Sequence, residues 1–294
     1  MKLFCFGLGY SARVLAHRLT QRGWEIAGTC RSAAQRDALA AHGYAVRLFD
    51  GTKRFDDLGI LAGTTHLLAS APPDADGDPV LRHFRDVVAE LGLDWAGYLS
   101  TTGVYGDSGG AWVDENAPLR PSGERGRRRT EAEAGWLALW RARRVPVHVF
   151  RLAGIYGPGR SPFDAVRNGR ARHIDRPGHL FSRIHVEDIA TVLEASIARP
   201  RGGAVYNVCD DVPASPADVT DYACRLLGRE PPQLVSFEAV AAGMTPMARS
   251  FWDDNRRVSN ARIKEELGVR LRYPDYKTGL AGLLAEESSP LEGG

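Results

Sequence analysis

Apolar and polar positions alternate in blocks along this chain. Short runs of consecutive apolar residues, typical of strands buried on both faces, are separated by longer stretches in which apolar residues recur every three or four positions. The predicted strands cover residues 2–7, 24–30, 44–50, 65–70, 95–101, 145–152 and 204–209. The predicted helices cover residues 11–23, 33–43, 79–91, 124–144, 187–199 and 215–229. This alternation predicts an α/β fold with a doubly wound parallel sheet.

The pattern changes in the later part of the chain, where no further sheet strand is predicted after about residue 209. We expect a loop over residues 153–162 and mainly helical structure from residue 255 to residue 284. The chain is therefore expected to form two regions. Residues 1–154 with 184–211 would form the sheet domain, and residues 155–183 with 212–294 a smaller lobe over the carboxyl ends of the strands.

Composition excludes several classes of protein. The chain has 294 residues, of which 44% are hydrophobic and 25% charged, and its net charge is +2, as in ordinary globular proteins. The basic run 125–129 lies in a chain that is almost neutral, so we expect no nucleic-acid partner. No apolar run of about 18 residues and no signal peptide are found, which predicts a cytoplasmic protein without a membrane partner. Four cysteines without metal-ligand spacing, Cys5, Cys30, Cys209 and Cys224, are expected to be reduced and buried, and no metal is expected.

A glycine-rich turn joins the first predicted strand to the first predicted helix. Gly7, Gly9 and Ala12 form a G-x-G-x-x-A pattern, with Tyr10 and Ser11 between them. In this setting the first glycine permits a tight turn, the second lets a diphosphate approach the backbone, and the alanine lets the helix pack on the strand. The turn predicts dinucleotide binding. The alternative is a strand-to-helix turn that is tight for packing alone.

The residues after the second strand discriminate between dinucleotides. Binders of NAD usually place a carboxylate there for the ribose hydroxyls, but this chain has Arg31 and Ser32, and no carboxylate before Asp37 in the next helix. A guanidinium group beside a hydroxyl suits a 2′-phosphate, which favours NADP, with NAD as the alternative. Arg31 is also compatible with an ordinary solvated surface residue. Asp50, at the end of the third strand, either accepts a hydrogen bond from the adenine amino group or is a turn residue.

Five further stretches resemble the extended short-chain dehydrogenase/reductase family, the NAD-dependent epimerase/dehydratase group. They are YLSTTGVYGD (98–107), ENAPLRPSGERGRRRTEAE (115–133), FRLAGIYGPGR (150–160), RIHVEDIA (183–190) and VYNVCDDVPAS (205–215). The resemblance implies a Rossmann-type sheet, a small substrate lobe and a nicotinamide cofactor. It also implies that Ser70 and Ala71 lie along the cofactor diphosphate or ribose, and that Thr101 supplies the hydroxyl that binds the reacting oxygen.

The chain departs from this family at the residues that carry proton transfer. The resemblance places Arg125 where the family has its catalytic Tyr, and Arg129 where it has its Lys. A guanidinium group, with a pKa above about 12, cannot exchange a proton near neutral pH, but it can stabilise an oxyanion or bind an anion. Gly154 stands where many relatives have a substrate-binding Asn, which argues against a sugar-nucleotide substrate.

Two tyrosines near the expected pocket, Tyr105 and Tyr156, are either substitute acids or packing residues of their motifs, and we favour packing. The Tyr273–Lys277 pair is interpreted as a coincidence, because Pro274 interrupts any helix across it.

The sequence thus favours an NAD(P)-dependent oxidoreductase or epimerase-like enzyme that acts on a small molecule. The alternative is a non-catalytic NADP-binding redox sensor or partner-binding protein. A homodimer is also considered, because Trp136 and Trp140 lie four residues apart on one predicted helix and could form an apolar surface. An internal core contact explains the same two residues.

Overall fold

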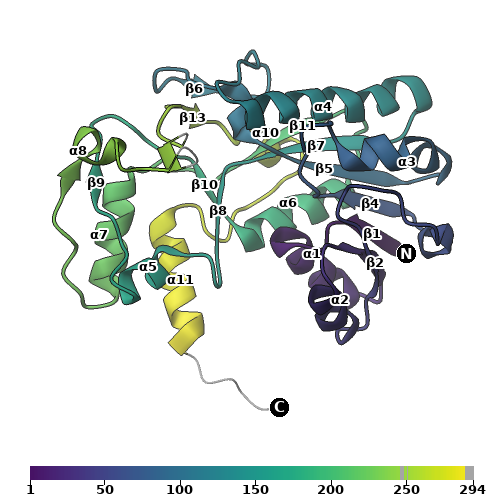
Figure 1. The fold of residues 1–294 in the computed structure, drawn as a ribbon, viewed down its shortest axis with the longest axis horizontal. Helices are drawn as coiled ribbons and strands as arrows, with labels where there is room; N and C mark the ends of the chain where they lie inside the picture. The colour runs from purple at the N-terminus through teal and green to yellow at the C-terminus, as the bar shows by residue number, and fades with distance from the viewer. Residues whose placement is uncertain (246–247, 250, 289–294) are drawn as a thin grey trace.

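The computed structural model describes residues 1–245, 248–249 and 251–288. Its centre is a seven-stranded parallel sheet with the strand order β11-β7-β5-β4-β1-β2-β3 (Figure 1). The strands are β1 (Lys2–Phe6), β2 (Glu25–Cys30), β3 (Ala45–Leu48), β4 (His66–Ala69), β5 (Trp95–Thr101), β7 (Val147–Leu152) and β11 (Val205–Val208). Each of the seven lies within a strand that the apolar runs predict, so the fold class is confirmed.

Helices cover both faces of the sheet, as the alternating pattern predicts. They are α1 (Tyr10–Thr20), α2 (Ala33–Ala40), α3 (Pro79–Glu90), α4 (Glu124–Arg143) and α6 (Val186–Ala198). Successive side chains of β1 point to opposite faces. Leu3 and Cys5 join a core cluster with α1 and α6, whereas Phe4 and Phe6 join a second cluster with α3 and α4. Two hydrophobic layers therefore hold the sheet between two sets of helices.

Shorter elements lie mostly beside the sheet, over the carboxyl ends of its strands (Figure 1). The strands are β6 (Trp112–Val113), β8 (Gly154–Tyr156), β9 (Ile174–Asp175), β10 (Arg183–His185), β12 (Val235–Ser236) and β13 (Arg257–Val258). The helices are α5 (Pro162–Arg167), α7 (Pro216–Leu226), α8 (Phe237–Ala241), α10 (Ala261–Glu265) and α11 (Tyr276–Ser288). The sequence pattern predicted helical structure at α7, α10 and most of α11, but not the short strands, α5 or α8. The pairs are β8 with β10, β9 with β12 and β6 with β13. Residues expected to form a loop thus include β8, and the C-terminal segment expected to be helical includes β13.

Two C-terminal features agree with the sequence analysis. Helix α7 begins after Ser215, whose Oγ accepts a hydrogen bond from the amide of Asp218 at 3.0 Å. Helix α11 begins at Tyr276, after Pro274, so Tyr273 and Lys277 do not lie on one helix.

The four cysteines are free and buried, as expected. Within the described residues, no helix is long and apolar enough to cross a membrane, and no group of three or more His, Cys, Asp or Glu side chains could hold a metal ion. Trp136 is fully buried, stacks on Tyr98 and donates a hydrogen bond to Asp78 at 3.1 Å. This aromatic residue therefore packs in the core, and the homodimer remains a prediction.

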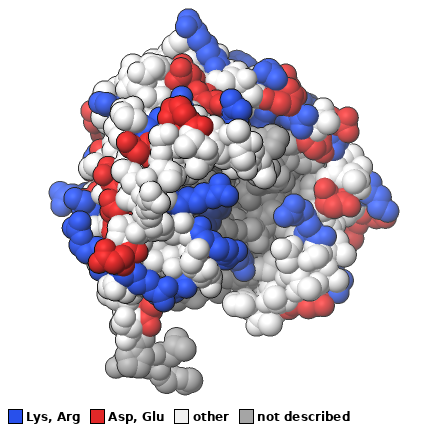
Figure 2. Space-filling model, turned by 60° about the vertical axis from the view of Figure 1, so that its left-hand side comes forward, with Lys and Arg blue, Asp and Glu red and all other residues white. Residues whose placement is uncertain are grey.

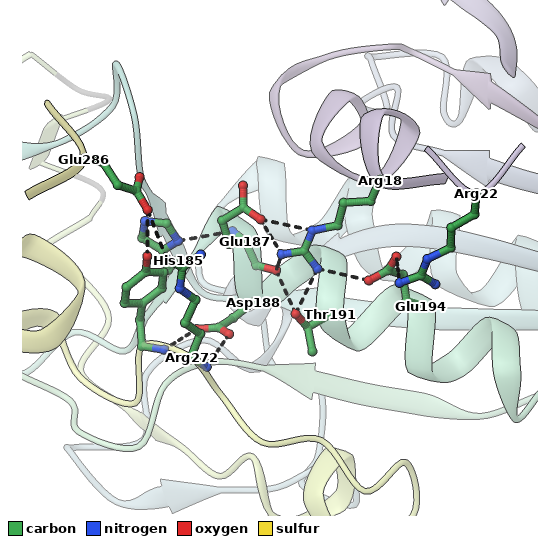
Figure 3. Close-up of polar contacts among 10 residues, drawn as sticks. Arg18, Arg22, His185, Glu187, Asp188, Thr191, Glu194, Arg272 and Glu286 are labelled. Carbon is green, nitrogen blue, oxygen red and sulfur yellow. Dashed lines mark hydrogen bonds and ion pairs between the residues drawn. The ribbon is translucent and has the colours of Figure 1, made fainter. Parts of the chain in front are cut away.

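Arg18 joins the first helix to α6 across one face of the sheet (Figure 3). Its guanidinium group forms an ion pair with Glu187, a second ion pair of 3.0 Å with Glu194, and a hydrogen bond of 3.1 Å to Thr191. Arg22, one turn later, forms a single ion pair among the described residues, of 3.1 Å with the other carboxylate oxygen of Glu194. The side chain of Arg18 is 24% exposed and that of Arg22 61%, so solvent screens the second contact far more.

We predict that Arg18→Ala lowers the free energy of unfolding by about 2–3 kcal/mol, because it removes several charge-assisted hydrogen bonds and leaves the partly buried carboxylate of Glu187 without its partner. The matched control, Arg22→Ala, should change it by no more than about 0.5 kcal/mol. Urea denaturation followed by circular dichroism measures both values. Equal effects of the two substitutions would contradict this account of the contact between α1 and α6.

Candidate functional site

A cavity of about 1200 Å³ opens at the carboxyl ends of the central strands. Its lining comes from the glycine turn, the end of β5, the first turn of α4, the segment after β7 and residues 251–256. Lys and Arg side chains border a hollow on the face shown in Figure 2. Open α/β sheets place their ligand sites at this edge. The cavity is therefore the candidate functional site.

The glycine turn is held by hydrogen bonds from two neighbouring strands. The amide of Gly7 donates to Oγ1 of Thr29 at 2.9 Å, and Oγ of Ser70 donates to the carbonyl oxygen of Gly7 at 2.7 Å. The φ angle of Gly7 is +91°, and a Cβ there would lie only 3.1 Å from Oγ of Ser70 and 3.3 Å from the amide nitrogen of Ala71. Only glycine fits this position without strain.

The first turn of α1 is open to a ligand. Gly9 is the N-cap and has no side chain to accept from the amides of that turn, and a Cβ added to Gly9 would meet nothing within 4 Å. Tyr10 and Ser11 line the cavity, whereas Ala12 is fully buried beneath them. Unpaired amides at a helix N-terminus, together with the helix dipole, form a binding site for phosphate. The backbone therefore fits a dinucleotide diphosphate.

Tyr10 also connects this turn to the other wall of the cavity. Its hydroxyl group donates to the carbonyl oxygen of Pro158 at 3.0 Å, and the guanidinium group of Arg160 lies 5.8 Å from its ring centroid. The segment after β8 is thus attached to the glycine turn through one side chain.

Ser70 lines the cavity, whereas three other residues predicted to bind the cofactor, Arg31, Ser32 and Asp50, lie outside its lining. Arg31 is exposed at the end of β2, and it has no hydrogen bond or ion pair with the described part of the chain. Ser32 caps α2, since its Oγ accepts from the amide of Gln35 at 3.3 Å. Oδ1 of Asp50 accepts from the amide and the hydroxyl group of Thr52, which lowers the pKa of the Asp50 carboxyl. Asp50 thus has the contacts of a turn residue, and a contact with adenine remains a prediction.

The three residues predicted to act in catalysis all line the cavity. Oγ1 of Thr101 accepts from the amide of Gly103 at 3.1 Å, which leaves the hydroxyl proton free to donate. Nη1 of Arg129 donates to the carbonyl oxygen of Leu99 at 2.7 Å and to the hydroxyl group of Tyr98 at 3.1 Å. This leaves the other guanidinium donors of Arg129 free. Arg125 is exposed and contacts no hydrogen-bond partner among the described residues.

The two tyrosines considered as substitute acids have their hydroxyl groups engaged elsewhere. That of Tyr105 accepts from Arg151 at 2.8 Å and donates to Asn207 at 2.7 Å, and burial raises its pKa to about 12. That of Tyr156 points to the carbonyl oxygen of Asp275 at 3.4 Å, and burial raises its pKa as well. Both contacts agree with the packing interpretation.

A buried polar network that the sequence analysis missed lies beneath the cavity. Glu133 of α4 forms an ion pair of 2.8 Å with Arg151 of β7, and both side chains are at most 5% exposed. Oγ of Ser100, which lines the cavity, donates to Glu133, and Arg151 continues to Tyr105 and Asn207. Arg151, a charged residue within the largely apolar run 147–152, is the signal that could have revealed this pair.

His185 and Asp188 have structural roles. Nδ1 of His185 accepts from the amide of Glu187 at 3.2 Å, so the histidine itself caps α6, and burial lowers its pKa to about 4. Asp188, in the first turn of the same helix, accepts from the amides of Arg272 and Tyr273 at 2.8 and 2.9 Å (Figure 3). This carboxylate attaches the C-terminal segment to the sheet domain.

The comparisons place this fold among known proteins. No family model matches the chain. Protein YeeZ of Escherichia coli strain K12 is 31% identical over 290 residues, which cover 93% of this chain and 97% of YeeZ. A functionally unknown conserved protein from Silicibacter pomeroyi DSS is 53% identical and superposes with a TM-score of 0.90 over 97% of this chain and 98% of that chain.

Another solved structure, from Methylobacillus flagellatus, is provisionally named an NAD-dependent epimerase/dehydratase. It is 27% identical, with a TM-score of 0.72 over 98% of this chain and 99% of that chain. The chain belongs to the extended short-chain dehydrogenase/reductase family. In fold, the chain also matches dTDP-glucose 4,6-dehydratase from Bacillus anthracis str. Ames in complex with NAD, at 17% identity and a TM-score of 0.76 over 99% and 98% of the two chains.

One buried carboxyl group behind the cavity of this family member has an unusual pKa. Asp210 follows β11, is 2% exposed, and neither of its carboxyl oxygens has a hydrogen-bond partner among the described residues. Burial raises its pKa to about 8, although the charge of the nearby Arg183 opposes this shift. The folded chain therefore holds a proton on Asp210 at pH 7.

This proton predicts a particular dependence of stability on pH. The unfolded chain loses the Asp210 proton near pH 4 and the folded chain near pH 8, so wild-type stability should fall as pH rises across this window. Asp210→Asn keeps the shape and removes the ionisation. We expect the free energy of unfolding of the variant to equal that of the wild type near pH 4 and to exceed it by roughly a few kcal/mol at pH 9.

Urea denaturation at a series of pH values measures this difference. The control is Asp86→Asn, which removes an exposed carboxyl group and should give the same difference from wild type at every pH. If the difference in free energy of unfolding between Asp210→Asn and the wild type does not change with pH, the raised pKa of Asp210 is refuted.

Proposed function

We propose that this protein is an NAD(P)-dependent oxidoreductase or epimerase-like enzyme in which two arginines replace the family's Tyr and Lys. The observation that supports the proposal is one continuous cavity. It joins the open first turn of α1 at Gly9–Ser11 to the Thr101 hydroxyl group and to the guanidinium groups of Arg125 and Arg129. A dinucleotide site and a set of polar groups suited to a reacting carbonyl therefore share one space.

The residues of the cavity fit a dinucleotide. The amides after Gly9 would bind the diphosphate, and Arg31 would bind a 2′-phosphate, which favours NADP over NAD. Arg129 has donors left after its contacts with Leu99 and Tyr98, so it would hold the ribose hydroxyls in place of a lysine. When bound, the nicotinamide supplies or accepts the hydride.

The chemistry at the substrate oxygen differs from that of a tyrosine enzyme. Thr101 would donate its free hydroxyl proton in a hydrogen bond to that oxygen, and Arg125 would stabilise the negative charge that develops there. Neither group exchanges a proton near pH 7. The proton that completes a carbonyl reduction must therefore come from water, for which the open cavity leaves access. General acid catalysis is worth about a hundred- to ten-thousandfold, so slow turnover is expected.

One observation favours the second candidate, a non-catalytic NADP-binding sensor. Both tyrosines near the cavity use their hydroxyl groups in other contacts, and a guanidinium group cannot replace them as an acid. Coenzyme binding without turnover is the property that distinguishes a sensor from an enzyme.

The coenzyme preference can be tested through Arg31. We expect NADPH to bind more tightly than NADH, and Arg31→Ala to weaken NADPH binding at least about tenfold, because a charge-assisted contact with phosphate is lost. NADH binding should not change. Fluorescence titration measures both affinities, with Arg36→Ala, an exposed arginine on α2 that pairs with Asp37, as the control. Equal affinity of the wild type for NADPH and NADH would contradict the proposal that Arg31 binds a 2′-phosphate.

Catalysis can be tested with a panel of carbonyl compounds and NADPH. We expect wild-type turnover, and a loss of about tenfold or more in kcat for Thr101→Val and for Arg125→Met, because each removes a group that stabilises the oxyanion. The affinity for NADPH should stay within about twofold. Arg127→Met, which changes an exposed arginine outside the cavity lining, is the control.

Tight coenzyme binding without turnover across the panel would support the sensor instead. In that case, Arg125→Tyr combined with Arg129→Lys tests whether the rest of the pocket is still competent. Turnover gained by this double variant would show that only the proton donor was lost.

A further inference from the structure

The lining of the cavity carries an excess of positive charge. Six arginines and three carboxylates line it among the described residues: Arg125, Arg128, Arg129, Arg160, Arg183, Arg256, Glu124, Asp253 and Asp254. Two of the carboxylates are already paired with cations. Glu124 accepts from Arg128 at 3.1 Å, and Asp254 accepts from Arg256 at 2.8 Å. Asp253 also faces a neighbouring hollow beside Arg176 and His179.

Arg125 stands out because no carboxylate neutralises it. It lies in the first turn of α4, where the positive end of the helix dipole disfavours a cation. The acidic residue of that turn, Glu124, is engaged by Arg127 at 2.8 Å and by Arg128. Arg125 itself is exposed to the cavity and has no ion pair or hydrogen bond with the described residues. A position that is unfavourable for folding and open to a cavity is typical of a binding residue.

A second cation reaches the cavity from the opposite wall. Arg160 follows β8 and contacts the ring of Tyr10, but it forms no ion pair with a described carboxylate. By contrast, Arg183 donates to the carbonyl oxygens of Phe181 and Ala214 at 2.9 and 2.8 Å, and Arg129 is held by β5. The charge available to a ligand therefore belongs mainly to Arg125 and Arg160.

We propose that the substrate carries a carboxylate group beside its reacting carbonyl, and that Arg125 binds this carboxylate in addition to stabilising charge on the neighbouring reacting oxygen. The inference rests on the proposed function, because it uses the cavity assigned there to the substrate. A guanidinium group binds a carboxylate through two parallel hydrogen bonds, and a single charge of this kind matches one free arginine. The Thr101 hydroxyl group lines the same cavity, so a 2-oxo or 2-hydroxy acid places its second oxygen within the space that Thr101 borders.

The same residue then has two effects on selectivity. It attracts the anionic substrate, and it gains no charged partner when a neutral carbonyl compound binds instead. A guanidinium group also pairs with phosphate, so inorganic phosphate is the competing anion against which the carboxylate is tested.

Binding can be measured before any substrate is known. The probes are oxamate, which is a carboxylate, its neutral analogue oxamide, and inorganic phosphate, each titrated calorimetrically into NADPH-saturated protein at constant ionic strength. We expect oxamate to bind at least about tenfold more tightly than oxamide. Arg125→Met should weaken oxamate binding by a similar factor while NADPH affinity stays within about twofold. Arg127→Met, an exposed arginine of the same helix that does not line the cavity, should behave as the wild type.

Stability provides a second readout that loss of folding could not imitate. Arg125 has no ion-pair partner to lose among the described residues, and a cation is unfavourable at this helix terminus. Arg125→Met should therefore melt at the same temperature as the wild type or slightly higher. Reduced oxamate binding in a variant that is fully stable is the expected combination.

Three results would overturn the inference: oxamate binding unchanged in Arg125→Met, oxamide or phosphate binding as well as oxamate, or no probe binding to the NADPH-loaded wild type. Failure of the proposed function is seen separately, as absence of NADPH binding. The oxamate titration is repeated on coenzyme-free protein, so that such a failure does not prevent the test of Arg125.

Discussion

The buried ion pair between Glu133 and Arg151 determines where the candidate site stands. It joins the middle of α4 to β7, and through Ser100 and Tyr105 it reaches β5 and β11. Two charges removed from water are tolerated only when their geometry is satisfied, and the loss of one partner typically costs about 3–5 kcal/mol. Because the network permits one position of α4 on the sheet, it also fixes the first turn of that helix, with Arg125 and Arg129, beside the end of β5.

The sequence predicts the sheet well because parallel strands covered on both faces must be continuously apolar. Runs such as residues 95–101 and 145–152 have that property, and both contain strands of the sheet. The short strands were missed for a physical reason. β8 and β13 contain three and two residues, too few to show a period, and their pairing partners β10 and β6 lie far away in the sequence. Such elements depend on tertiary contacts.

The site could be predicted in part. The glycine turn was readable because Gly7 has a backbone conformation and a packing distance that exclude other residues. The positions of Thr101, Arg125 and Arg129 at one cavity follow from the family motifs. The hydrogen-bond partners of hydroxyl groups and carboxylates could not be predicted from sequence motifs. Tyr105 and Asp188 have partners at Asn207 and at residues 272–273, and no local pattern indicates contacts across such separations. The charge balance of the cavity likewise became visible only with the fold.

The hydroxyl group of Tyr10 couples the two walls of the cavity. The amide of this residue belongs to the turn that would hold the diphosphate, while its side chain is fastened to Pro158, two residues before the cationic Arg160. A ligand that immobilises the turn therefore also restrains the opposite rim. If two ligands bind in the cavity, both require the segment joined by the Tyr10–Pro158 hydrogen bond to become rigid. The ligand that binds first bears this entropic cost and thereby lowers it for the second.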